Sequence, residues 1–201
     1  MKKTFLSVFL LLVTSCGEPV GSKSDNSTST NSPSSTEQNL EQFASGELKI
    51  SSNEEDAFWG FIDLQGQWNY YAGIYVEAYL DDNVGIDEFL EIGIYSYNEL
   101  VEIYNQMASN HAVFQTPLLI DMFTPALNNY YKKIDALYTI LEGVDSLNIE
   151  LEERGILLLD EAAEEGRQIA CDLFQDLNSE SIRNILQTSD LAKLDTLKNI
   201  C

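Results

Sequence analysis

The feature that most constrains the fold is the helical spacing of apolar residues along most of the chain after residue 50. It is clearest behind Thr116, a suitable N-cap residue that a proline follows in the first turn. From there apolar side chains recur every three or four residues as far as Leu141, with Gly143 as the expected stop. Pro125 lies inside this pattern, so we expect either a kink there or a later start near Thr124.

Similar spacing predicts two more long helices and two short ones near the C-terminus. They cover residues 87–108 and 150–177, and the short ones follow Ser179 and Ser189. No internal repeat or second linker interrupts residues 51–201, so we expect them to form a single domain. The sequence therefore predicts a mainly α fold: an antiparallel bundle of about four long helices with two short C-terminal helices.

Residues 54–80 fit both a helix and a strand. Glycines at positions 60, 66 and 73 would each cost a helix interior about 1 kcal/mol. From Trp68 to Leu80 alternate residues are apolar, as in a half-buried strand. We favour the helix, because the acidic residues at 54–56 suit the positive N-terminal end of a helix.

The N-terminus has the organisation of an export signal. Two lysines precede an apolar run over residues 5–13, and small residues lead to Cys16. The run is far shorter than the roughly twenty residues that cross a bilayer as a helix. We therefore expect residues 1–15 to be removed as a signal peptide.

The residues at the expected cleavage site, Val13, Thr14, Ser15 and Cys16, resemble the lipobox of bacterial lipoproteins. The resemblance covers this signal alone. It implies that the Cys16 thiol receives a diacylglyceryl group, that the chain is cut just before it, and that the new amino group is often acylated too. Two or three acyl chains make such an attachment durable. The resemblance implies a lipid anchor in the bacterial cell envelope, and Gly17 in place of Asp is compatible with outer-membrane sorting; the side of the membrane stays open.

Residues 16–50 differ in composition from the rest of the chain. They are rich in Ser, Thr, Asn and Gln and offer almost nothing to bury. Such a segment stays disordered. We expect it to hold the acidic domain of residues 51–201 away from the lipid surface.

The charge of the chain is strongly negative. Without the two signal lysines, 33 acidic residues stand against nine basic ones, and no Lys or Arg occurs between Lys49 and Lys132, where thirteen acids occur. Nucleic acids and anionic lipid surfaces are disfavoured as partners, because binding them requires clustered basic residues. A basic protein, a polyamine or a divalent cation fits better, unless the charge only keeps the protein soluble.

Two cysteines remain once Cys16 is assigned to lipid. Disulfides persist outside the cytoplasm, so we predict that Cys171 and Cys201 form a bridge. It would close a loop of about thirty residues and stabilise the fold by roughly 3–4 kcal/mol. A metal-binding thiol pair or two free thiols are the alternatives, although a metal site would need more soft ligands than the single histidine, His111, can supply.

The sequence offers little support for catalysis. One histidine cannot supply the two Glu-x-x-His motifs of a di-metal bundle, and we expect His111 to be a solvent-facing turn residue. No nucleophile elbow, P-loop or dinucleotide-binding fingerprint occurs. We therefore expect no enzyme activity, no cofactor and no bound metal.

Aromatic residues crowd the segment 54–80 beside acidic ones. Aromatic faces next to carboxylates can receive ammonium or guanidinium groups, although such residues more often form a core. The candidate binding residues in this segment are Trp68, Tyr70, Tyr71 and Tyr75.

The turn that follows offers several oxygen ligands. Its candidates are Asp81, Asp82, Asn83 and Asp87. The spacing only loosely matches a calcium-binding EF-hand loop, because Ile86 and Ile92 occupy the places of the required glycine and glutamate. A plain interhelical turn is the favoured interpretation, with calcium binding left open.

These observations predict a membrane-tethered envelope lipoprotein that acts as a non-catalytic binding or interaction module. The acidic and aromatic surface within residues 54–104 is its expected binding surface. A receptor for a cation or cationic small ligand, or a purely structural lipoprotein, is the alternative.

Overall fold

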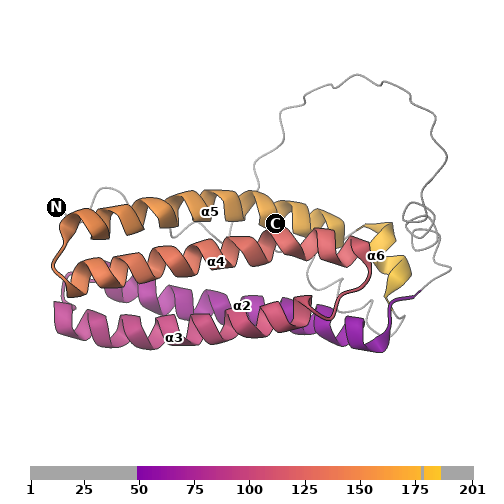
Figure 1. The fold of residues 1–201 in the computed structure, drawn as a ribbon, viewed down its shortest axis with the longest axis horizontal. Helices are drawn as coiled ribbons and strands as arrows, with labels where there is room; N and C mark the ends of the chain where they lie inside the picture. The colour runs from indigo at the N-terminus through magenta and orange to yellow at the C-terminus, as the bar shows by residue number, and fades with distance from the viewer. Residues whose placement is uncertain (1–48, 178, 187–201) are drawn as a thin grey trace, which may run out of the picture. The chain divides into compact units, whose positions relative to one another are not determined.

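The computed structural model describes residues 49–177 and 179–186, and all regular secondary structure in them is helical (Figure 1). The helices are α2 (Ser52–Leu80), α3 (Ile86–His111), α4 (Pro117–Asp145), α5 (Ile149–Leu177) and α6 (Glu180–Ile185). The predicted mainly α bundle with four long helices is confirmed, and residues 54–80 are helix. The expected signal peptide, the expected lipidation site Cys16, the expected helix after Ser189 and Cys201 lie outside the described residues.

The chain divides into two compact units, each described by itself. In the described residues, the first unit covers 51–170 and the second combines 49–50 with 171–177 and 179–186. In the second unit the Ser179 hydroxyl caps α6. The backbone N–H of Ile50 donates to the carbonyl oxygen of Ile185 at 3.1 Å. Lys49 Nζ donates to the carbonyl oxygen of Leu186 at 2.7 Å. The two residues expected at the end of the tether are thus bonded to the segment around α6.

The core of the first unit is aromatic where α2 meets α4. The ring of Phe123 lies 4.6 Å from that of Phe61, 5.6 Å from Phe58 and 5.3 Å from Phe114. Leu100 and Met107 of α3 are completely buried as well. Burial of these side chains, each worth about 1.5–3 kcal/mol, is what joins the helices.

Helix α4 begins at Pro117, so the alternative start near Thr124 is wrong. The helix continues through Pro125, where the Thr124 hydroxyl donates to the carbonyl oxygen of Ile120 at 2.6 Å. It also passes Gly143 and ends at Asp145, so the predicted stop is wrong. Gly143 is needed for packing, because a Cβ atom there would lie only 2.4 Å from the backbone nitrogen of Glu152 on α5.

Candidate binding surface on helix α3

Two of the predicted binding residues belong to the core. Trp68 is 3% exposed and Tyr75 is 1% exposed. The Trp68 ring packs 4.6 Å from that of Tyr130, and the Tyr75 hydroxyl donates to the carbonyl oxygen of Leu137 at 3.0 Å. Neither side chain can present its face to a partner, so the surface interpretation is corrected for both: they join α2 to α4.

Tyr70 is exposed and Tyr71 is half-buried, on the surface of α2. Tyr70 is 64% exposed, and its ring lies 5.2 Å from that of Tyr71. Tyr71 in turn lies 6.1 Å from the exposed ring of Tyr95. Hydrogen bonding to Tyr95, some burial and the nearby Glu99 raise the pKa of Tyr71 to about 12. Part of the predicted aromatic surface therefore exists, and α3 contributes to it.

The predicted oxygen ligands of the α2–α3 turn do not converge. Asp81 Oδ1 accepts hydrogen bonds from the backbone N–H and the side-chain amide of Asn83, at 2.9 and 2.8 Å. This is a local Asx turn. Asp82 and Asp87 are exposed, and Asp87 lies in the first turn of α3. Within residues 49–177 and 179–186, no three His, Cys, Asp or Glu side chains are grouped closely enough to hold a metal ion.

A second group of tyrosines, which the sequence analysis missed, lies where α3 packs against α4. Tyr97 lies 5.9 Å from Tyr138, and Tyr104 lies 6.0 Å from Tyr131, measured between ring centroids. We call these four residues the tyrosine strip. The two members on each helix are seven residues apart, two helical turns, so antiparallel helices bring them into register. That spacing is visible in the sequence, but the register of α3 against α4 is not.

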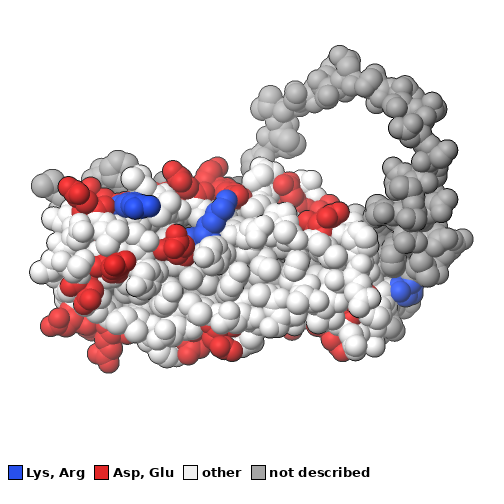
Figure 2. Space-filling model, in the orientation of Figure 1, with Lys and Arg blue, Asp and Glu red and all other residues white. Residues whose placement is uncertain are grey.

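The tyrosine strip is accessible. Tyr131 is 59% exposed and Tyr138 is 51% exposed, whereas Tyr97 and Tyr104 are half-buried. Figure 2 shows a broad area over α3 and α4 without charged side chains; acidic side chains border it, with a few basic ones toward α5. Burial raises the pKa of Tyr97, and the neighbouring side chains of Tyr138, Asp135 and Tyr131 raise it further. Asp135 lies four residues after Tyr131 and three before Tyr138, so it is on the same face of α4 as the strip.

An open cleft of about 500 Å³ adjoins the strip between α4 and α5. Its lining residues are Thr124, Pro125, Asn128, Tyr131, Lys132, Glu165 and Ile169. Tyr131 thus belongs to both the strip and the cleft.

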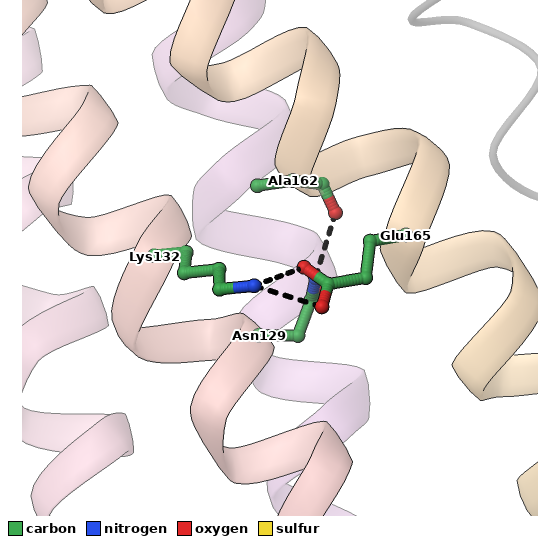
Figure 3. A network of polar contacts seen from close by, with 4 residues as sticks. All are labelled: Asn129, Lys132, Ala162 and Glu165. Carbon is green, nitrogen blue, oxygen red and sulfur yellow. Dashed lines mark hydrogen bonds and ion pairs between the residues drawn. The ribbon is translucent and has the colours of Figure 1, made fainter.

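A polar network joins α4 and α5 beside this cleft (Figure 3). Lys132 Nζ donates to both carboxylate oxygens of Glu165, at 2.6 and 2.8 Å. The buried Asn129 amide donates to the carbonyl oxygen of Ala162 at 2.7 Å. The hydrogen bond from Lys132 holds the pKa of Glu165 below its usual value, although burial acts in the opposite direction. The network fixes how the two helices face each other.

His111, the residue on which nucleophilic catalysis would depend, is part of the helix packing. It is the last residue of α3, and its Nε2 atom lies 2.9 Å from the Thr124 hydroxyl oxygen. Because that hydroxyl donates to Ile120, it accepts from Nε2–H, and the imidazole ring also packs on Phe114 at 5.8 Å. The expected solvent-facing turn residue is therefore a half-buried side chain that ties α3 to α4.

Comparison of the chain with protein-family models, with curated proteins and with solved structures finds no significant match. In the part of the chain that the structure describes, no helix has an apolar stretch long enough to span a membrane.

Proposed function

We propose that the chain is a lipid-anchored, non-catalytic interaction module of the bacterial envelope, and that a protein partner binds over α3 at the tyrosine strip. The observation that carries this proposal is the two tyrosine pairs between α3 and α4, whose members on α4, Tyr131 and Tyr138, are exposed. Tyrosine has a large apolar ring and a polar tip, so it is enriched at interfaces and among the residues that dominate binding energy.

The charge of the domain supports a basic partner. Residues 51–170 contain four Lys and Arg against 23 Asp and Glu, a net charge of −19. Complementary charge accelerates the encounter of partners and suppresses wrong ones. Two copies of this domain would repel each other, so a basic protein fits better than a second copy.

Photo-crosslinking in the cells that make the protein tests the position of the partner surface. We would place p-benzoylphenylalanine at Tyr131 or Tyr138, where a similar aromatic ring already stands. Leu157 is the matched control, because it is 62% exposed but lies on α5. We expect the same crosslinked protein from both tyrosine positions and none from position 157. Equal crosslinking from all three, or none from the tyrosines, would reject the proposal.

The lipid anchor needs a separate test. We propose that Cys16 carries the acyl chains, as the lipobox resemblance implies, with the protein in the cell envelope. Growth with an alkyne-tagged fatty acid should label the wild-type chain, and Cys16→Ser should remove both the label and the retention in the membrane fraction. Labelling that survives in Cys16→Ser would place the lipid at another residue, and an unlabelled wild-type chain would reject the anchor.

The cleft between α4 and α5 supports a second candidate, a receptor for a small ligand. Its volume of about 500 Å³ lies in the range of small-molecule sites. A ligand at a hundred times its dissociation constant should stabilise the fold by about 2.7 kcal/mol. Thermal unfolding against a panel of divalent cations and polyamines, with Glu165→Gln as the cleft variant, separates this function from protein binding. A shift that Glu165→Gln abolishes would favour the receptor.

A further inference from the structure

One carboxylate lies among the rings of the tyrosine strip. On α4, Tyr131, Asp135 and Tyr138 are spaced by four and three residues, so they share one face of the helix. Tyr97 of α3 faces Tyr138 at 5.9 Å, measured between ring centroids, and the charge of Asp135 contributes to the raised pKa of Tyr97. An exposed acid is thus flanked by three aromatic side chains.

The cations of the bundle do not neutralise this acid. Helices α2 and α3 carry no Lys or Arg. Lys132 pairs with Glu165, and Lys133 Nζ stands 5.5 Å from the centre of the Tyr130 ring. Of the residues that the structure describes, no Lys or Arg is within ion-pair distance of Asp135. A cation from outside the chain would meet both a carboxylate and aromatic faces there.

The chemistry of the cluster distinguishes between the two basic side chains. A guanidinium group is planar and weakly hydrated, so it can stack on a tyrosine ring while it donates two hydrogen bonds to one carboxylate. An ammonium group is a compact and strongly hydrated charge that gains less from the rings.

We infer that Tyr97, Tyr131, Asp135 and Tyr138 form a binding site for an arginine side chain of the protein partner. This inference rests on the proposed function, and it names the chemistry by which the tyrosine strip recognises its partner. Attraction of a cation to an aromatic ring contributes about 0.5–1 kcal/mol at an exposed site, and the charged hydrogen bond to Asp135 adds to it.

The test is a titration of the full chain with three probes at one ionic strength, followed by NMR or calorimetry. The probes are a Gly/Ser peptide with two arginines, the same peptide with two lysines, and free spermidine. We expect the arginine peptide to bind most tightly and to shift the signals of Tyr97 and Tyr138. Equal or tighter binding of the lysine peptide or spermidine, or no binding of any probe, would overturn the inference.

Two variants of equal charge locate the site. Asp135→Asn should weaken the binding of the arginine peptide by about fivefold or more, since it removes the charged hydrogen bond. Asp121→Asn changes the net charge equally at another exposed position of α4, and we expect less than a twofold effect. Equal effects of both would show attraction by net charge alone and reject the site. Thermal unfolding of each variant checks that it is folded.

The outcome is separable from that of the proposed function. Crosslinking at Tyr131 and Tyr138 that persists in Asp135→Asn, together with failure of the arginine titration, would keep the surface and discard the arginine site. Failure of the crosslinking itself would discard the surface.

Discussion

The backbone N–H of Thr116, the N-cap residue of α4, donates to Oε1 of Glu54 in the first turn of α2 at 2.8 Å. The N–H of Gln115 donates to the same oxygen, also at 2.8 Å, while the Glu54 carboxylate closes a capping box with Ser51. One buried carboxylate thus satisfies the starts of two helices that are far apart in sequence. Burial raises the pKa of Glu54, but the hydrogen bonds from the backbone at Gln115 and Thr116 outweigh it and leave the pKa below its usual value.

Replacing Glu54 should therefore destabilise the domain. Glu54→Ala leaves buried N–H groups without an acceptor, which costs about 1–3 kcal/mol of unfolding free energy. Because the folded pKa is lowered, the ionised carboxylate stabilises the fold above its unfolded pKa of about 4.5, and this contribution is lost as the pH falls through the folded pKa. Urea unfolding at pH 7 and pH 3 measures both effects.

Asp56, an exposed acid in the same turn of α2, is the control for this prediction. Asp56→Ala also removes one negative charge but no described hydrogen bond between helices. We expect it to change stability by less than about 0.5 kcal/mol. If Glu54→Ala changed the unfolding free energy no more than Asp56→Ala at both pH values, the hydrogen bonds between Glu54 and the start of α4 would not stabilise the fold.

The local sequence pattern predicted most of the helices. It gave a wrong helix end where packing against another helix determines the residue type. The glycines of residues 54–80 make the choice between helix and strand ambiguous in the sequence. No packing contact requires two of the three, because Cβ atoms at Gly66 and Gly73 would have no neighbour within 4 Å. The sequence predicts a helix stop at Gly143. In the structure this position requires glycine because the backbone of α5 approaches it closely. A single sequence does not show which backbone a glycine faces.

Alanine at the unopposed glycines should stabilise the fold. Gly66→Ala and Gly73→Ala should each raise the unfolding free energy by about 0.5–1 kcal/mol, because glycine is a poor residue for a helix interior. Gly143→Ala should instead destabilise, since its Cβ atom would lie 2.4 Å from the backbone nitrogen of Glu152. Chemical denaturation of the three variants measures the difference. A gain at position 143 would show that α4 and α5 are less close than described.

The true end of α4 offers another stabilising change. The N–H of Asn148 donates to the carbonyl oxygen of Gly143 at 2.8 Å, and the N–H of Leu147 donates to the carbonyl oxygen of Val144 at 3.2 Å. These two hydrogen bonds form a Schellman motif. Leu147 has a left-handed φ of 53° and is 73% exposed. Left-handed backbone costs a residue with a Cβ atom about 1–2 kcal/mol. Leu147→Gly should therefore gain about 0.5–1 kcal/mol after the added flexibility of the unfolded chain is subtracted.

Leu147→Ala separates backbone strain from the loss of the side chain. It removes most of the exposed side chain but keeps the Cβ atom, so we expect no comparable gain. Thermal unfolding of both variants is the measurement. Equal melting temperatures would mean that the left-handed conformation is not what limits stability at this helix end.

The predicted disulfide is a separate matter, because Cys201 lies outside the described residues. Alkylation without reduction, followed by mass spectrometry, should find Cys171 and Cys201 protected together. Cys171→Ser and Cys201→Ser should each cost roughly 3–4 kcal/mol, and the double variant should cost no more than either alone. Additive losses would contradict a bridge between them.

The sequence predicts only part of the candidate site. The aromatic and acidic composition of residues 54–104 indicated a binding surface, but Trp68 and Tyr75 are core residues, while Tyr131 and Tyr138 come from α4. Helical periodicity assigns a tyrosine to a face. It does not show which tyrosine of the neighbouring helix stands opposite.

A buried amine at the α4–α5 contact should make the stability of the domain depend on pH above neutrality. Lys133 Nζ lies beside Gly166, where a Cβ atom would be only 2.9 Å away. Burial lowers the pKa of Lys133 to about 8, and the attraction of Glu165 opposes the shift only in part. The folded state therefore binds its proton less tightly than the unfolded chain does, whose pKa is near 10.4. Protonated Lys133 destabilises the fold below pH 8, and stability is regained as the pH rises from about 8 to 10.

Lys133→Met removes this penalty while it keeps a long side chain. We expect a gain on the order of 1–2 kcal/mol at pH 7 that shrinks toward pH 10, measured by urea unfolding at both values. Lys132→Met is the control, because Lys132 is exposed and its ion pair with Glu165 is worth at most about 1 kcal/mol. Other groups of the chain are the same in wild type and in both variants, so their effects cancel in the comparison. A gain for Lys133→Met that stays equal at pH 7 and pH 10 would come from packing and would show that the amine keeps its ordinary affinity for a proton.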